Sequence, residues 1–242
     1  MARKPSHHRL LPVVLILALV LPAIVVSDSA HAAKKKAKKR VVATVKVMNI
    51  IEKIEKTLLE TRYQHVTRVR AHRGEYFFDC SGMAAWILRR SAPNALRVVG
   101  KPNGRRPLAV HFFKKIARIP IGEKRGPWER VRTAAHARPG DLIAWIRPKW
   151  FPSKSTGHVA FVVGNPKINH GPVPGILVRI ADASKFKHED DSRDADVTGY
   201  GTGVLLIPTD KKAQPTGYGW VGSHTKPDWV VPTELVIGRP LR

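Results

Sequence analysis

The sequence contains a single cysteine, Cys80, among its 242 residues. A lone cysteine cannot form a disulfide within its own chain, so the small disulfide-rich secreted scaffolds are excluded. Its thiol is then either a small buried apolar group or a working nucleophile, and its neighbours in the chain decide between the two.

Acidic residues are also scarce, since 18 Asp and Glu face 43 Lys and Arg, for a formal net charge of +25. Such a surface favours anionic polymers: nucleic acid, anionic lipid or cell-wall material. The basic residues are scattered without interleaved aromatic residues and form no nucleic-acid-binding module. We therefore expect no nucleic acid as partner, and composition alone does not choose between an anionic cell-envelope polymer and an anionic membrane surface.

The apolar run Leu10–Val26 is interrupted by two prolines and is short for a membrane-spanning helix, which needs ~20 residues. Basic residues precede it, and Ala30 and Ala32 follow it in the small-x-small spacing that signal peptidase accepts. This layout predicts a secretory signal peptide over residues 1–32. The basic cluster at 34–40 opposes translocation, so an uncleaved anchor is the alternative to cleavage. Both interpretations predict export to the periplasm, the cell wall or the medium.

After the signal we expect a basic linker over 33–45 and one domain over 46–242. The linker lacks apolar periodicity and is expected to be disordered. Apolar residues then recur at helical spacing from Val47 to Leu58, which predicts an amphipathic helix. Further helices are expected over 79–90 and from about 107 to 116.

Beyond Gly140 the pattern changes to short runs of Val, Ile and Leu separated by Gly, Pro and Asn. Such runs predict strands, at 142–146, 159–163, 176–181 and 204–207, with a last edge strand at 235–237. Helices first and strands later predict an α+β fold, in which N-terminal helices pack on a small antiparallel β-sheet. We expect a monomer.

Cys80 directly follows Asp79, a good N-cap residue, at the start of the helix expected over 79–90. The unpaired N–H groups and the positive end of the helix dipole favour a thiolate at such a position. The sequence therefore predicts that Cys80 is a reactive nucleophile.

The base is expected to be His158, because this histidine opens an apolar strand and would lie at the edge of the sheet. A hairpin centred on His170 would place Asp182 opposite His158, where a carboxylate can hold the imidazole in its productive tautomer. His188 is the alternative third residue. This chemistry needs neither a metal nor an organic cofactor.

Three motifs, in this order, resemble those of the NlpC-type family of bacterial cell-wall peptidases. They are Asp79-Cys80-Ser81-Gly82-Met83, Arg138-Pro139-Gly140-Asp141-Leu142-Ile143 and Gly157-His158-Val159-Ala160-Phe161-Val162-Val163-Gly164. The resemblance covers residues 60 to 185 or so. It implies a papain-like fold, with Cys80 as nucleophile and His158 as base. It also implies cleavage of amide bonds in the peptide stems of peptidoglycan, usually next to D-Glu.

The chain departs from the family pattern in several places. The third catalytic residue of the family is a polar group, often His, on the strand after the Gly-His-Val motif, and Asp182 stands at that place here. Tyr63 is what remains of the family's upstream tyrosine motif, and we assign Tyr63 and Ser81 to substrate binding. The insert between residues 93 and 138 and the extension after about 185 are atypical.

Three other features of the sequence give weaker indications of function. The run His188-Glu189-Asp190-Asp191 lacks a matching cluster for metal binding and is expected to be a solvated loop. The run Gly199-Tyr200-Gly201-Thr202-Gly203 precedes an expected strand instead of following one, so it is no dinucleotide fingerprint. Trp220 and Trp229 could flank a substrate groove or cap a sheet.

The sequence leaves three function classes open. The first is an exported Cys–His(–Asp) hydrolase acting on peptidoglycan. The second is a non-catalytic cationic module that kept the fold and binds the wall or the membrane. The third is a Cys–His acyltransferase or amidase with another substrate. The presence of both Cys80 and His158 favours the first and third classes over the second.

Overall fold

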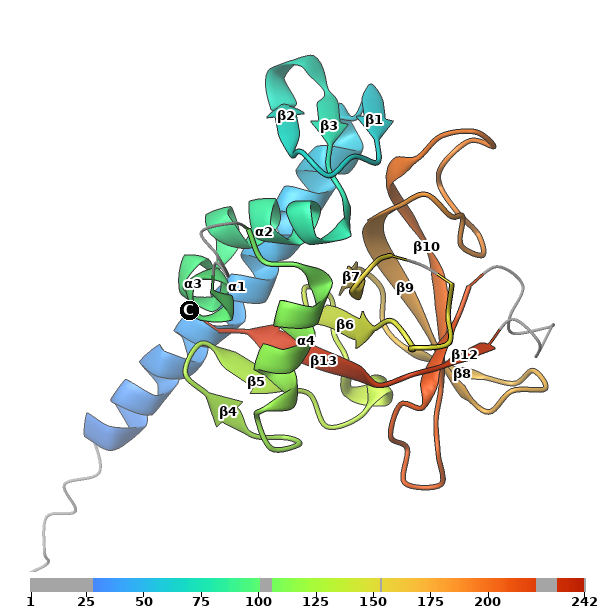
Figure 1. The fold of residues 1–242 in the computed structure, drawn as a ribbon. Coiled ribbons are helices and arrows are strands. Elements are labelled where there is room, and N and C mark those ends of the chain that lie inside the picture. The colour runs from blue at the N-terminus through green and yellow to red at the C-terminus, as the bar shows by residue number, and fades with distance from the viewer. Residues whose placement is uncertain (1–27, 101–105, 153, 221–229, 242) are drawn as a thin grey trace, which may run out of the picture.

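The computed structural model describes residues 28–100, 106–152, 154–220 and 230–241 (Figure 1). Most of the expected signal peptide, residues 1–27, lies outside these ranges. No helix within them is both long enough and apolar enough to cross a membrane.

Helix α1 (Asp28–Thr57) runs through the segment 33–45 that we expected to be a disordered linker. The expected disorder of this segment is therefore wrong, whereas the division into a linker and a domain stays a prediction. The segment is made largely of Ala and Lys, which are both good helix formers, and this explains why it can continue the helix. The amphipathic part is confirmed, since Val47, Ile51 and Ile54 are buried.

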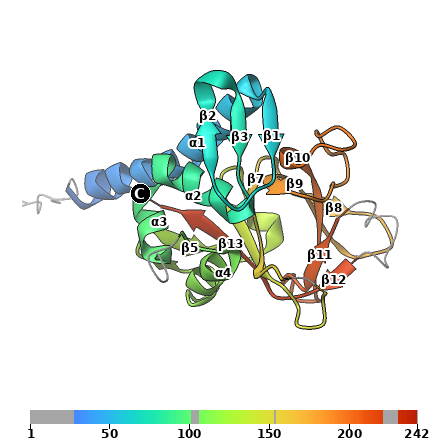
Figure 2. The ribbon, with the colours of Figure 1, turned by 45° about the horizontal axis from the view of Figure 1, so that its top comes forward.

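A small sheet follows α1, and its three-residue strands were not predicted. It contains β1 (Glu60–Arg62), β2 (Arg68–Arg70) and β3 (Glu75–Phe77) in the order β1-β3-β2, with β1 parallel to β3. The 3₁₀ turn η1 (Ala71–Arg73) joins β2 to β3. Figures 1 and 2 show this sheet at the C-terminal end of α1, at the top of the molecule. Strands this short contain too few residues to show a period of two.

The other helices agree with the sequence. Helix α2 (Cys80–Ser91) has Asp79 as its N-cap, α3 (Pro93–Val99) follows at once, and α4 (Ala109–Ala117) comes after residues 101–105. The helices expected over 79–90 and near 107–116 are thus confirmed as α2 and α4. A further 3₁₀ turn, η3 (Ala134–His136), precedes the main run of strands.

The main sheet has ten strands, all paired antiparallel, among the described residues. The strands are β4 (Lys124–Arg125), β5 (Trp128–Arg130), β6 (Leu142–Ile146), β7 (Gly157–Val162), β8 (Lys167–Asn169), β9 (Gly175–Ser184), β10 (Gly199–Pro208), β11 (Gly217–Gly219), β12 (Val230–Pro232) and β13 (Leu235–Pro240). Their order is β12-β11-β10-β9-β7-β6-β13-β5-β4, and β8 pairs with β9. Helices packed on an antiparallel sheet are thus confirmed, but the sheet is not small.

Strand β13 corrects the expectation of a last edge strand at 235–237. It pairs with β6 on one side and with β5 on the other, so it lies inside the sheet. The strands that cover this edge, β4 and β5, come from the atypical insert, where no strand was expected. Pairing between segments so far apart in the chain leaves no local mark in the sequence.

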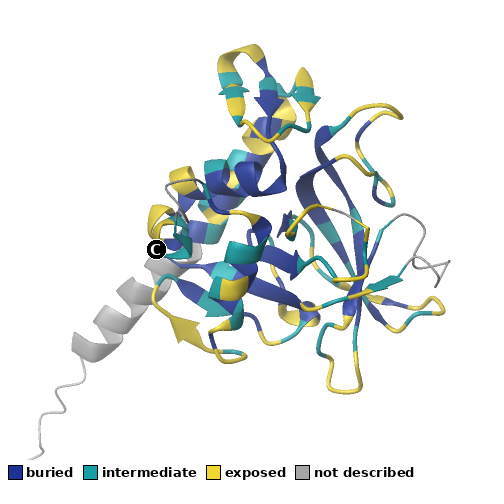
Figure 3. Cartoon of the chain, in the orientation of Figure 1, coloured by how far each residue is buried: buried dark blue, intermediate teal, exposed yellow. Residues whose placement is uncertain are grey.

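Both faces of the central strands are buried, as the dark ribbons in Figure 3 show. Along β6, Leu142 and Ala144 face a core shared with α1, α2 and α4. Ile143 and Trp145, on the opposite face of the strand, belong to a second core made largely of strand residues. Burial on both faces explains why these runs are continuously apolar instead of alternating with polar residues.

Candidate active site

Cys80 is the first residue of α2, and its side chain is buried against the helix core with 5% exposure. The Asp79 carboxylate caps this helix by accepting a hydrogen bond from the Gly82 N–H at 2.7 Å. The sequence-based placement of Cys80 at a capped helix start is therefore confirmed. The thiol lies where the helix dipole favours a negative charge.

A negative charge on Asp79 next to the thiol would oppose a thiolate, and neighbouring groups compensate for it. Arg106, from the segment between α3 and α4, forms an ion pair with Asp79 Oδ2 and donates to the His65 carbonyl at 2.9 Å. The Nδ1 atom of His65 lies 3.1 Å from the same carboxylate oxygen. The atypical insert thus places a cation beside the start of α2.

Ser81, which we expected to bind substrate, contacts the groups that cap α2. Its side chain is buried, and its hydroxyl donates to Asp79 Oδ1 at 3.1 Å and accepts from Arg106 Nη1 at 2.6 Å. Both contacts stabilise the helix start. The Ser81 side chain therefore has a structural role here, and it is not among the described residues that line the cavity beside His158, so its assignment to substrate binding stays a prediction.

His158 lies at the start of β7, directly opposite Trp145 of β6. Gly157 makes this strand start possible: its φ is +136°, and a Cβ atom on it would lie 2.0 Å from the Trp145 carbonyl oxygen. The His158 ring packs against the Trp145 ring with centroids 4.9 Å apart. The backbone and the indole together fix the imidazole, whose side chain is 13% exposed.

Asp182 of β9 meets His158 as expected, with 2.5 Å between Nε2 and Oδ2. The register differs from the expectation, because Phe161 pairs with Ala181 and Val162 with Ile180, a shift of two residues. A shift of two keeps every side chain on its face of the sheet, and so the contact survives the error. The hairpin in this region is formed by β8 and β9 instead.

A carboxylate can only accept, so His158 donates to Asp182 from Nε2, and Nδ1 is the ring nitrogen left for the Cys80 thiol. Burial lowers the pKa of His158, but the charge and hydrogen bond of Cys80 and those of Asp182 outweigh it and raise this pKa to about 10. Cys80, His158 and Asp182 therefore form one electrostatic unit, drawn from α2, β7 and β9.

The two candidates for the third residue are separated by geometry. His188 lies 3.2 Å from Asp182 Oδ2 through its Nε2 atom. No hydrogen bond between His188 and His158 or Cys80 is found among the described residues. Burial would raise the pKa of Asp182, but the charge of His188, together with the hydrogen bond and charge of His158, brings it well below its ordinary value. Asp182 is thus the direct partner of His158, and His188 is a partner of Asp182.

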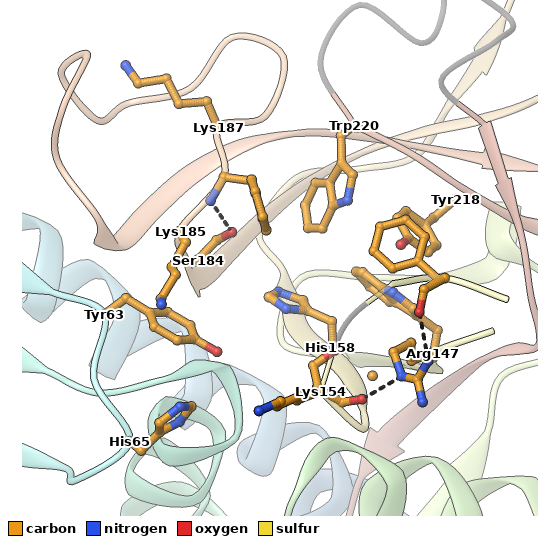
Figure 4. Close-up of a pocket in the computed structure, with 15 residues that line it drawn as sticks. Tyr63, His65, Arg147, Lys154, His158, Ser184, Lys185, Lys187, Tyr218 and Trp220 are labelled. Carbon is orange, nitrogen blue, oxygen red and sulfur yellow. Dashed lines mark hydrogen bonds between the residues drawn. The ribbon is translucent and has the colours of Figure 1, made fainter. Parts of the chain in front are cut away.

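A cavity of about 680 Å³ opens beside His158 (Figure 4). Tyr63 lines it and points its hydroxyl into it, next to His158. Burial, followed by the charges of Cys80 and Asp79, raises the pKa of Tyr63, so its hydroxyl is a stable proton donor. The described lining contains no carboxylate but four cations: Arg147, Lys154, Lys185 and Lys187.

These cations differ in what they can offer a ligand. Arg147 donates to the carbonyls of Ser155 and Phe151, at 2.9 and 2.7 Å, and braces its own loop. The amino group of Lys187 donates to the Arg193 carbonyl and points away from the cavity in Figure 4. Lys185 lies over the Tyr63 ring, 5.6 Å from its centroid. Lys154 and Lys185 are therefore the cations best placed to meet an anionic ligand.

Comparisons of the chain with protein-family models, with curated proteins and with solved structures find no match. The site therefore rests on its own geometry.

The remaining motifs lie elsewhere than expected. His188 is buried, so the run His188–Asp191 is not a fully solvated loop, and no group of His, Cys, Asp or Glu in the described ranges is arranged to hold a metal. The glycine run 199–203 lies within β10 and not before a strand. Trp220 lines the cavity, and Trp229 lies outside the described residues.

Sequence reasoning missed His65, Arg106, Lys154 and Lys185. None of these residues belongs to a periodic pattern or a capping motif, and each reaches the site from a loop. The only available signal was the cationic composition, which does not say where a charge lies.

Proposed function

We propose that this chain is an exported cysteine hydrolase of the NlpC type, with a papain-like arrangement of its site, that cleaves amide bonds in peptidoglycan stem peptides. The observation that carries the proposal is the convergence of Cys80, His158 and Asp182 from three separate elements. A thiol paired with a histidine, which is in turn held by a carboxylate, is the arrangement that activates a nucleophile for acyl transfer.

In the proposed reaction the Cys80 thiolate attacks the amide carbonyl carbon and forms a C–S bond. His158 then gives its proton to the nitrogen as the C–N bond breaks, and the amine leaves. Water attacks the resulting thioester, His158 takes a proton from this water, and the acid product departs with the thiolate restored. Asp182 keeps Nε2 protonated, so that Nδ1 performs both proton transfers.

The oxyanion that forms in the first step needs hydrogen-bond donors near the thiol. Gly82 already donates to Asp79, so the N–H of Cys80, at the tip of α2, is the backbone donor we propose for this role. The Tyr63 hydroxyl, which stays protonated, is the second. This role would keep Tyr63 as the substrate-contacting residue of the site.

The composition of the cavity supports an anionic substrate. Lys154 and Lys185 lie at its wall, and no carboxylate lies among its described lining residues. Stem peptides carry carboxylates close to the bonds that such enzymes cut, and envelope polymers as a class are anionic. The signal-like N-terminus and the charge of +25 agree with export to such a compartment.

The decisive experiment is mass spectrometry of purified peptidoglycan after incubation with the protein. We expect fragments in which one amide has become an acid and a free amine. The Cys80→Ala variant should reduce their yield by about 10³-fold or more, because it removes the nucleophile. His170→Ala, which changes an exposed histidine in the turn between β8 and β9, serves as control and should retain full activity.

Other outcomes would point to the other classes. Binding of wall material without any fragments, unchanged in Cys80→Ala, would overturn catalysis and favour an adhesive module. Products in which the acyl group is transferred to an added amine instead of water would favour an acyltransferase.

A further inference from the structure

The site continues behind Asp182 into a buried polar cluster that the proposed reaction does not use. Its members are His188, Asp191 and Arg193, from the segment between β9 and β10. The side chain of His188 is fully buried, and those of Asp191 and Arg193 are 3% and 2% exposed. Ionisable groups buried this deeply are costly unless they are paired, so their arrangement calls for a physical reason.

Within the cluster, Arg193 holds Asp191 with two contacts, from Nε to Oδ1 at 2.9 Å and from Nη2 to Oδ2 at 2.6 Å. The Nδ1 atom of His188 lies 2.9 Å from Asp191 Oδ2 and 2.7 Å from Arg193 Nη2. This end of the imidazole is therefore anchored. The other end, Nε2, faces Asp182.

The glycine run of β10 makes room for this cluster. A Cβ atom on Gly203 would lie 2.5 Å from the Cβ of His188, and one on Gly201 would lie 2.5 Å from Nε of Arg193. Gly201 pairs with Asp182 in the sheet. The alternating glycines thus form a flat surface on which the segment after β9 lies, and they bring His188 and Arg193 beside the carboxylate.

His158 and His188 converge on the same oxygen, Asp182 Oδ2, at 2.5 and 3.2 Å. The other oxygen, Oδ1, has no hydrogen-bond partner among the described residues, and Arg193 Nη2 lies 3.8 Å from it. A carboxylate only accepts, so His158 donates to Oδ2 from Nε2, whereas the Nε2 atom of His188 has no hydrogen-bond partner among the described residues and acts on Oδ2 electrostatically across 3.2 Å. Two imidazoles that face one oxygen share its negative charge, so each weakens the hold of the oxygen on the other.

We propose that His188 is a positioning residue of the Cys80–His158 pair, which acts through Asp182 and limits how tightly that carboxylate holds the His158 proton. The inference rests on the proposed function in one respect: it assumes that His158 must release this proton to the leaving amine. It gives the atypical extension after residue 185 a role in the chemistry.

The groups that contact the two histidines determine which substitutions can test this role. His158 faces Cys80 from α2, Asp182 from β9 and Tyr63 from the loop after β1. His188 faces Asp182, Asp191 and Arg193, and its ring packs edge-on against Trp220 with centroids 4.2 Å apart. A variant at His188 should therefore disturb the contact to Asp182 while keeping the contacts on the Nδ1 side.

Two amide substitutions make this separation. In His188→Gln the side-chain amide can still reach Asp182, whereas in His188→Asn it is one methylene shorter and retains only the side facing Asp191. We expect the Asn variant to lose about tenfold in kcat with KM unchanged, and the Gln variant to stay within about twofold of the parent. His170→Asn is the matched control on the surface.

The lone cysteine gives a second readout that needs no substrate. Iodoacetate is an anion and reacts faster with a thiolate beside an imidazolium than beside a neutral ring, while iodoacetamide is neutral. The ratio of the two alkylation rates of Cys80 therefore falls when His158 loses its proton. In His188→Asn this fall should move to higher pH by about half a unit or more, and in His188→Gln it should stay in place.

The two readouts separate the two ideas. If the pH at which the ratio of alkylation rates falls is unchanged in the Asn variant, or is lower, the role of His188 is overturned even if peptidoglycan is cleaved. A shift as expected, without cleavage of any wall material, keeps the role of His188 and overturns the proposed function. If the Asn variant does not fold, Gly203→Ala tests the same contact, because its Cβ would push His188 away from Asp182 and should produce the same upward shift.

Discussion

At the scale of single residues, Cys80 and Asp182 together determine when His158 is protonated, because both raise its pKa. The carboxylate is fully buried, and burial alone would favour its neutral form. It stays ionised because His188 and His158 both face it, and in return it stabilises the imidazolium of His158 together with Cys80. The proposed chemistry thus depends on a carboxylate that acts through His158.

Asp182→Asn should lower the pH at which His158 loses its proton. The pKa of His158 is raised to about 10, so the imidazolium is present below this pH and is lost as the pH rises through it. Asp182 is one of the two groups that raise this pKa, so replacing its charge should lower the pKa of His158. We expect the midpoint of the basic limb of the kcat/KM profile to move to lower pH by about one pH unit or more. Activity at neutral pH should drop by about 10²-fold.

The measurement is kcat/KM against pH, with Asp196→Asn, an exposed aspartate of the segment before β10, as control. The expected shift is opposite in sign to that of His188→Asn. A basic limb that does not move in Asp182→Asn would show that the carboxylate does not control the charge of His158.

At the scale of elements, the pairing of β6 with β7 positions His158, the proposed base. At Gly157 the backbone of β7 leaves no room for a Cβ atom beside β6, and the residue adopts a conformation that L-residues rarely reach. The position of His158 therefore depends on the absence of a side chain at the residue before it.

Gly157→Ala should destabilise the fold by about 3 kcal/mol, because it adds both backbone strain and a clash with the Trp145 carbonyl. Gly126→Ala is the matched control: its φ is also positive, at +59°, but no atom lies within 4 Å of its Cβ position. It should cost only about 1–2 kcal/mol. Urea unfolding measures both, and equal losses in the two variants would contradict the role of the clash.

Some elements of this fold can be predicted from local sequence patterns, and others cannot. The starts of α2 and β7 follow from an N-cap and an apolar run, which are read within a few residues. The interior position of β13 and the small sheet β1–β3 could not be read in this way, because their neighbours in space come from elsewhere in the chain. The high charge of 33–45 predicts disorder, but Ala and Lys are good helix formers, and the segment continues α1.

At the scale of the whole molecule, the net charge of +25 should produce diffuse binding to wall material. Exposed charges are screened over about 8 Å at physiological ionic strength, so cosedimentation with purified cell walls should weaken steeply as salt is added. Replacing the six basic residues of segment 34–40 by Gln should weaken binding at low salt. The rate of turnover on a small soluble peptide should change much less.

Binding that ignores salt, or that is unchanged by the Gln replacements, would point to a specific groove. The cavity beside His158 is then the first place to look, with Lys154, Lys185 and Trp220 at its wall.

The sequence by itself determined the placement of Cys80 at a capped helix start, of His158 at a strand start and of Asp182 on the same face of the sheet as His158. These placements follow from caps and apolar runs, which are local, and from the period of two in a strand, which tolerates a register error of two residues. The sequence also restricted the chemistry, because a single thiol leaves one candidate nucleophile of its kind.

Only the tertiary structure decided that Arg106 and His65 meet Asp79, and that His188 shares Asp182 with His158. It also decided that Ser81 faces inwards and that the glycines of β10 make room for His188 and Arg193. The physical reason is the same in each case. These contacts join loops and strands that are distant in the chain, and an ion pair between such segments leaves no periodic pattern in either of them.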